Sequence, residues 1–168
     1  MAFFQSFLRA PRSSALIGVS SLVSTFCSQH ENCQDLPEIV TIISLYEEFL
    51  GPNCQPFDQV EEDRMILSLK GLRNIGFVKN AASKIETCYQ DTTNSMFLRL
   101  AALDTIRKLS CQSSTFDYKR QLLATFGETT LDSELRIGAY LAIMTCPSTG
   151  TVNYVKSILT HEPVNQGL

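Results

Sequence analysis

The sequence predicts an all-α protein in which helix pairs stack into a two-layered solenoid. Apolar residues recur at helical spacing along nearly the whole chain of 168 residues, whereas the strict alternation typical of strands is almost absent. Two stretches, LRLAAL at 98–103 and LRIGAY at 135–140, repeat one pattern 37 residues apart. A repeat of this length holding two antiparallel helices is typical of an α-solenoid. A non-repeating helical bundle with accidental similarity is the alternative.

The first part of the chain predicts two helices. Apolar residues at 3–8 favour a short amphipathic helix that ends before Pro11, because proline has no N–H to donate. A longer apolar helix follows at 14–27. A secretory signal sequence would place its positive charges first, whereas Arg9 and Arg12 come after the aromatic residues. We therefore expect an intracellular protein or an internal piece of a larger one.

Seven further helices are predicted, and their ends carry the expected signals. Asp35 and Asp58 each precede a glutamate by three residues, which is the spacing of a capping box, and Ser114 and Asp132 can cap two later helices. Glycine or proline follows most of the apolar stripes. One predicted layer contains the helices at 36–50, 77–89, 115–126 and 151–161, and the other those at 60–75, 94–110 and 132–146.

Six cysteines occur at separations related to the repeat. Two pairs are 34 and 35 residues apart, so their members would lie side by side on neighbouring repeats, and a third pair closes a short loop after the second helix. Small tilts can bring such residues within the Cα separation of roughly 4.4–6.8 Å that a disulfide requires. The expected pairs are Cys27 with Cys33, Cys54 with Cys88 and Cys111 with Cys146. Buried free thiols are the alternative, and disulfides would indicate an oxidising compartment.

The sequence suggests no catalytic, metal-binding or cofactor-binding residue. His30 lies between two cysteines, but a zinc site would need two more ligands nearby, and neither a GxSxG elbow nor a phosphate-binding glycine loop is present. The acidic run at 61–63 suits the first turn of a helix. A pI near 5.4 with scattered lysine and arginine argues against nucleic-acid binding, and no apolar run reaches the roughly 20 residues of a membrane-spanning helix.

Two arginines occupy matching repeat positions. For Arg99 and Arg136 we expect pairing with acids such as Asp104 or Glu134 rather than anion recognition. Aromatic side chains are expected in the core and between repeats. The tyrosines expected there are Tyr46, Tyr118 and Tyr140.

Several stretches resemble the helical domain of the large lipid transfer proteins, which include vitellogenins, apolipophorins, apolipoprotein B and the microsomal triglyceride transfer protein. The most specific are SELRIGAYLAIMTCPS at 133–148 and TVNYVKSILTHEPVNQ at 151–166. SALIGVSSLVSTFCSQHENC at 14–33 and FLRLAALDTIRKLSC at 97–111 fit the same region in the same order. The arthropod apolipophorin-like branch looks most similar.

The resemblance implies a two-layered right-handed superhelix that wraps around β-sheets lining a lipid cavity. It also implies bridges equivalent to Cys27 with Cys33 and Cys111 with Cys146, whereas Cys54 with Cys88 rests mainly on spacing. The implied partners are lipids held by the parent protein's sheets, its own β-barrel and sheet domains, and a receptor or another subunit. The implied location is extracellular.

Family members normally carry an N-terminal β-barrel and lipid-binding sheets in addition to this region. We therefore expect residues 1–168 to be a partial helical domain that braces the lipid cavity of a secreted carrier, without catalysis, cofactor or cargo of its own. The alternative is an independent α-solenoid that binds a protein or peptide on its concave face. The oxidation state of the cysteines would separate the two.

Overall fold

The computed structural model describes residues 13–78, 81–109 and 117–161, and every regular element within these ranges is helical. This confirms the all-α prediction. A single 3-10 turn, η1, spans Cys33–Asp35. The α-helices are α2 (Ser13–Cys27), α3 (Pro37–Phe49), α4 (Gln59–Ile75), α5 (Ala82–Gln90), α6 (Met96–Leu109), α7 (Asp117–Gly127), α8 (Ser133–Ile143) and α9 (Thr149–His161).

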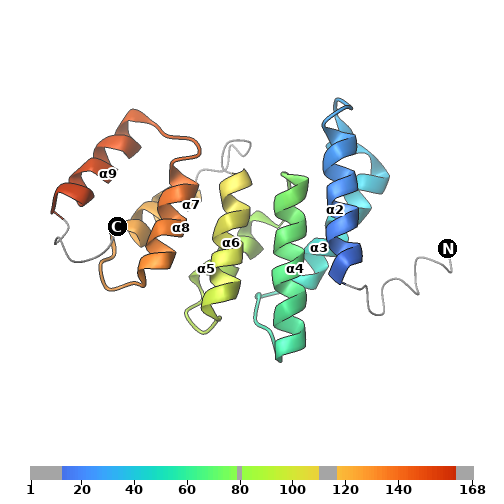
Figure 1. Ribbon diagram of the computed structural model, residues 1–168, viewed down its shortest axis with the longest axis horizontal. Coiled ribbons are helices and arrows are strands. Elements are labelled where there is room, and N and C mark those ends of the chain that lie inside the picture. The colour runs from blue at the N-terminus through green and yellow to red at the C-terminus, as the bar shows by residue number, and fades with distance from the viewer. Residues whose placement is uncertain (1–12, 79–80, 110–116, 162–168) are drawn as a thin grey trace.

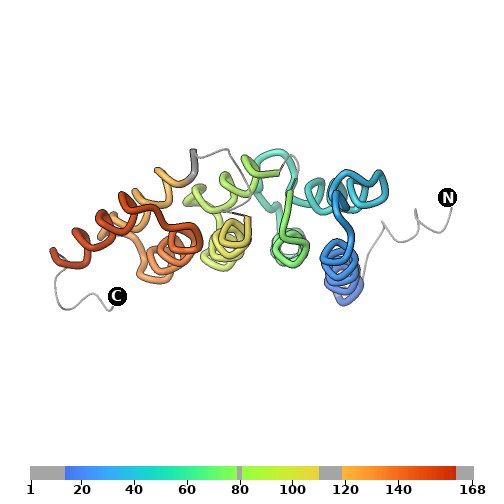
Figure 2. The backbone as a smooth tube through the Cα atoms, turned by 90° about the horizontal axis from the view of Figure 1, so that it is seen from above, coloured from blue at the N-terminus to red at the C-terminus, as the bar shows by residue number. Residues whose placement is uncertain are grey.

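The helices stack in two rows (Figures 1 and 2). In what we call the inner row, α2 packs on α4, α4 on α6 and α6 on α8. In the outer row, α3, α5 and α7 each pack against the inner-row helix that follows them, but make few or no direct contacts with one another. Because the inner helices lie closer together than the outer ones, the stack bends toward the inner row. This is the predicted solenoid of helix pairs, and α9 extends it by placing Tyr154 and Ile158 over Gly127 at the end of α7.

Capping follows the prediction at two helices and departs from it at a third. Asp58 accepts from Glu61 N at 2.8 Å at the start of α4, and Asp132 accepts from Glu134 N at 2.8 Å at the start of α8. The expected cap by Asp35 was wrong. Asp35 lies inside η1, and α3 instead starts with Pro37 after Leu36, with no side-chain cap. Ser114 lies outside the described residues.

Two predicted helix boundaries were also wrong. The helix expected at 77–89 begins only at Ala82, because Gly76 closes α4 in a left-handed conformation (φ 85°) and the described residues after it, Phe77, Val78 and Ala81, are not helical. The helix expected to reach Cys146 ends at Ile143. Pro147 disfavours a helical conformation for the residue before it, so the last turn unwinds.

In two successive repeats, the turn between the outer and the inner helix is built in the same way. Arg99 donates from Nε to the Tyr89 carbonyl at 2.9 Å, and 37 residues later Arg136 donates to the Phe126 carbonyl at 3.0 Å. Each arginine therefore binds the C-terminal end of the preceding outer-row helix, where unpaired carbonyls favour a cation. The expected pairing of Arg99 with Asp104 was wrong, because that carboxylate binds Arg73 at 2.6 Å.

The same turn carries an acid and a threonine. Thr93 donates its N–H and its hydroxyl to Asp91 at 2.8 and 2.6 Å, and Thr130 does the same to Glu128 at 3.2 and 2.7 Å. The bonds from these threonines hold the pKa of both carboxyls below their ordinary values. The acids therefore stay charged beside the arginine of their own turn.

The first repeat replaces this arrangement. In the register set by Asp58, Ser95 and Asp132, which are 37 residues apart, the position of Arg99 is taken by Glu62. The nearest arginine, Arg64, lies two residues further on, and its guanidinium lies 5.8 Å from the centre of the Phe49 ring. A disulfide takes the place of the acid and threonine.

The core is tightest where α3 crosses α4. Tyr46 is fully buried and donates its hydroxyl to the Leu16 carbonyl in α2. A Cβ on Gly71 would lie 2.7 Å from Tyr46 Cδ1. Three helices therefore meet around one ring, as predicted for Tyr46. Tyr140 is half-buried, and the side chain of Tyr118 lies outside the described set.

We expect Gly71→Ala to destabilise the protein by about 1–3 kcal/mol, the usual cost of overpacking, because the bound Tyr46 ring cannot move aside without losing its hydrogen bond. Gly18→Ala is the matched control. No atom lies within 4 Å of the position of its Cβ, so it should gain about 0.5–1 kcal/mol from helix propensity. Urea denaturation followed by circular dichroism measures both changes, and equal effects at the two glycines would contradict this packing.

We expect Arg136→Met to lower the free energy of unfolding by about 2–3 kcal/mol, since it removes a charged donor from a buried carbonyl. Arg136 is only 1% exposed. The control is Arg120→Met on the exposed side of α7, which should change stability by less than about 0.5 kcal/mol. The same denaturation measurement applies, and a neutral Arg136→Met would show that the turn does not depend on this contact.

Candidate functional site

Among the described residues, no group of three or more histidine, cysteine, aspartate or glutamate side chains could hold a metal ion. None of the described helices is long and apolar enough to cross a bilayer. The candidate functional features are instead the cross-links between elements and the exposed face of the inner row.

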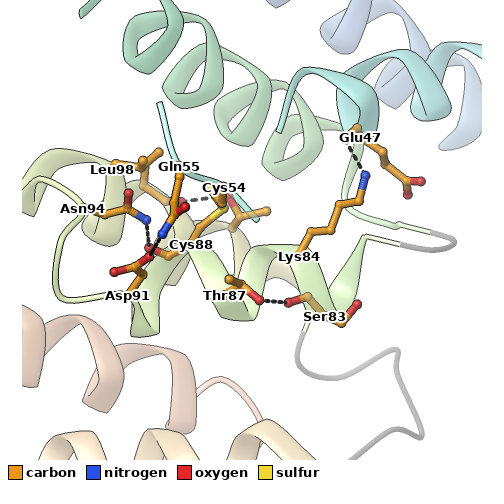
Figure 3. Close-up of a disulfide and its surroundings, with 12 residues drawn as sticks. Glu47, Cys54, Gln55, Ser83, Lys84, Thr87, Cys88, Asp91, Asn94 and Leu98 are labelled. Atoms are coloured by element: carbon orange, nitrogen blue, oxygen red, sulfur yellow. Dashed lines mark hydrogen bonds between the residues drawn. A yellow bond between two sulfur atoms is a disulfide. The ribbon is translucent and has the colours of Figure 1, made fainter. Parts of the chain in front are cut away.

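One disulfide joins two repeats (Figure 3). Cys54, in the loop between α3 and α4, bonds to Cys88 in the last turn of α5, with a Cα–Cα distance of 5.1 Å. Both cysteines are fully buried. The polar contacts around the bridge are Gln55 to Asp91 at 2.9 Å and Asn94 to the Cys88 carbonyl at 3.1 Å. The bridge and these bonds fix the loop before α4 to the turn after α5.

A second disulfide closes the turn between α2 and η1. Cys27 ends α2 and bonds to Cys33, with a Cα–Cα distance of 5.2 Å. His30, which lies in the enclosed loop, stacks on Phe26 rather than approaching the sulfurs as a ligand. Cys146 is also disulfide-bonded. Its expected partner, Cys111, lies outside the described residues.

Buried polar groups connect the repeats beside these bridges. Glu47 in α3 is buried and accepts from Ala81 N at 3.1 Å, so it serves the start of α5, which has no cap of its own. Lys84 donates to the Glu47 carbonyl at 3.3 Å (Figure 3). Burial raises the pKa of Tyr89 in α5 to about 12, so its hydroxyl stays neutral. The contacts of Glu47 and Lys84 therefore link α3 to α5.

The inner row presents an apolar groove between α6 and α8. Its volume is about 290 Å³, and Leu100, Ile137 and Leu141 supply its apolar lining. The helices approach closely there, because a Cβ on Gly138 would lie 3.1 Å from Leu103 Cδ1. The charged residues of the groove are Asp104, Arg107 and Glu134. The apolar lining of this groove suits contact with an apolar surface.

The grooves become more polar toward α2. A groove of about 600 Å³ between α4 and α6 combines apolar Ile66 and Phe97 with three acidic side chains and Lys70. The next, of about 420 Å³, lies between α2 and α4 and is lined by hydroxyl, amide and basic groups. Sequence reasoning missed this face. The available signal was that 135–143 is apolar nearly all round, so part of it must remain exposed once the core positions are filled.

Known proteins are similar to this chain along nearly its whole length. A family model described as the vitellogenin TPR domain matches residues 4–166. The chain is 34% identical over 151 residues to the apolipophorins of Drosophila melanogaster and 30% identical over 153 residues to those of Locusta migratoria, which is 89% and 90% of this chain. Human apolipoprotein B-100 is 29% identical over 134 residues, or 77% of the chain.

These relatives are far longer proteins. The matched region spans only 4% of either apolipophorin and 3% of apolipoprotein B-100. No solved structure matches the chain significantly. The family match over residues 4–166, together with the identity to two insect apolipophorins and the two-row stack of helices, shows that this chain belongs to the vitellogenin TPR domain family.

Proposed function

We propose that this chain forms a helical wall of a secreted lipid carrier, in which it braces the region that holds lipid. The observation that carries the proposal is the family match along nearly the whole chain. The apolar groove between α6 and α8 supports it, because a bracing wall needs a face that packs against another part of the carrier. Residues 1–168 would then be the helical part of that carrier, with its β-barrel and sheets contributed by other segments.

In this role the chain itself neither catalyses a reaction nor holds a cofactor. Its described polar clusters are used in helix caps, turns and links between repeats, and its grooves are open surfaces. Lipid would be bound through sheets of the parent protein, and the outer row would remain available to a receptor or another subunit.

Density flotation tests this proposal. An antibody raised against the chain should detect, in body fluid of the source organism, a polypeptide much larger than 18.7 kDa that floats with lipid. Delipidation of the sample is the control and should abolish flotation. Detection only in cell lysate, in the lipid-free fraction and at the mass of the chain alone, would contradict the carrier role and favour an independent solenoid.

The proposal includes an oxidising compartment, because the disulfides that tie the repeats together form and persist in one. We propose that Cys111 pairs with Cys146 in addition to the two described bridges. For the chain produced in a secretory system, reduction should add about six hydrogen atoms, two for each of three bridges. Intact mass measured with and without reductant checks this, and six free thiols in such protein would contradict secretion.

The two described bridges should differ in their effect on stability. In the entropic model, a bridge across 34 residues contributes about 4 kcal/mol and one across 6 residues about 2 kcal/mol. The double variant Cys54→Ala with Cys88→Ala should therefore lower the free energy of unfolding more than Cys27→Ala with Cys33→Ala. Urea denaturation of the oxidised proteins measures the difference, and the reverse order would show that local packing outweighs loop closure.

A further inference from the structure

Three apolar side chains are strongly exposed at the edge of the inner row where its helices begin. Phe57 is 95% exposed, Phe97 76% and Val60 66%. Phe57 lies two residues before α4, Val60 lies in the first turn of α4, and Phe97 lies in the first turn of α6. The beginnings of these two helices lie at the lower edge of the stack in Figure 1.

Phe97 lines a groove between α4 and α6, and Phe57 and Val60 flank Gln59 of that groove in the chain at the start of α4. The Ser95 hydroxyl donates to the Glu62 carboxylate and so joins the first turns of α4 and α6. Phe97 and Gln59, the neighbour of Val60, line the same groove between the two helices. We call Phe57, Val60 and Phe97 the aromatic edge. The groove of about 600 Å³ opens beside it, with Ile66 and Leu100 among its apolar residues.

The backbone that carries Phe57 is fixed at both sides. Cys54 is cross-linked to α5, and Gln55 donates to Asp91 at 2.9 Å. Phe57 itself donates its N–H to Glu61 at 2.7 Å. Single exposed apolar residues are common on protein surfaces. An exposed aromatic side chain on an ordered backbone is different, because little conformational entropy remains to be lost when a partner binds it.

The charges around the aromatic edge are mostly acidic. From Gln55 to Asp63 every charged residue is acidic, although Arg64 follows at once and Lys70 lines the groove together with Glu62 and Asp63. Asp91, bound to Gln55, adds a further acid on the adjoining turn. Bonds from Thr93 and then Gln55 keep its pKa below the ordinary value, so it is charged at neutral pH.

We propose that the aromatic edge and its groove bind a basic amphipathic segment of a partner protein. Aliphatic side chains of the segment would contact Phe57 and Phe97, and its lysine or arginine side chains would face Glu62 and Asp63. This is the helix-in-groove mode of recognition, with charge complementarity selecting the partner. The acidic rim disfavours an anionic membrane and a second copy of the same edge, because both would place like charges together.

This surface adjoins the groove between α6 and α8 that supports the proposed bracing role, and the two grooves share Leu100 and Asp104. It lies at the start of the helices, where the loop before α4 is displayed, so the inference goes beyond the proposed function. A carrier whose wall braces lipid through α6 and α8 keeps this edge free for a protein partner.

Binding to a defined peptide tests the inference. The probe is a synthetic helical peptide with leucine on one face and lysine on the other, titrated by calorimetry into the full chain with its disulfides formed. The matched probe carries glutamate in place of every lysine. We expect the lysine peptide to bind, with affinity falling as salt rises, and the glutamate peptide to bind at least about tenfold more weakly.

Matched variants locate the binding surface. Phe57→Ser and Phe97→Ser should each weaken binding of the lysine peptide by about tenfold, whereas Leu22→Ser, at a 72% exposed position on α2, should change it by less than about twofold. Asp63→Asn should reduce the salt dependence. Circular dichroism and thermal unfolding confirm that each variant folds, as expected for exposed positions.

A different occupant of the aromatic edge would give different results in these experiments. Equal binding of both peptides, or equal loss in Leu22→Ser and Phe57→Ser, would overturn the proposal. So would vesicle flotation that depends on Phe57, measured with phosphatidylcholine vesicles with and without phosphatidylserine. Sedimentation velocity gives the remaining outcome, since a dimer that dissociates in Phe57→Ser would assign the edge to a second copy.

Discussion

The rest of the structure depends on direct helix-to-helix packing within the inner row. A pair such as α5 and α6 buries only part of its apolar surface by itself, and inner helices such as α4 and α6 therefore also lie against an inner-row neighbour on each side. Small residues make this possible: Gly138 lets α8 approach Leu103 of α6, and Gly71 leaves space for the Tyr46 ring behind α4. The outer helices then fill the back of the row. Because contacts run only between neighbours, the stack is stable as a series of interfaces rather than as one central core.

The regular spacing of the repeats comes from the turns rather than from the helices. Helix lengths vary along the chain, yet Asp58, Ser95 and Asp132 begin successive inner helices 37 residues apart. In the later repeats, Arg99 and Arg136 join the start of the inner helix to the end of the outer one, so the angle between the two is set by a short hydrogen bond. The first repeat has Glu62 at this position and uses the Cys54–Cys88 disulfide instead. Two chemically different devices thus hold equivalent turns.

The sequence was informative where a residue acts through its own local backbone or through the repeat. Asp58 and Asp132 were identifiable as caps from spacing alone, and the cysteine separations pointed to Cys54 with Cys88. Contacts between elements were less accessible. Nothing in the sequence indicated that Arg99 would bind the Tyr89 carbonyl instead of Asp104, because helix ends compete with carboxylates for arginine and only the angle between helices decides which is nearer. The η1 turn displaced Asp35 for a similar reason, since the nearby disulfide reshaped the backbone before α3. The apolar inner face was missed because apolar residues occupy both buried and exposed positions of α8, so their pattern alone does not separate core from surface.

The positions of the cross-links explain how such a wall can keep an apolar face exposed. The described bridges lie at turns: Cys27–Cys33 follows α2, and Cys54–Cys88 joins the loop before α4 to α5. The middle of each inner helix is therefore left free of covalent ties, and its position is set by packing against its neighbours. A stack fixed in this way cannot readily fold over to bury Ile137 and Leu141 against another repeat. These exposed apolar residues therefore remain available to an external surface, and this is the property that a bracing domain requires.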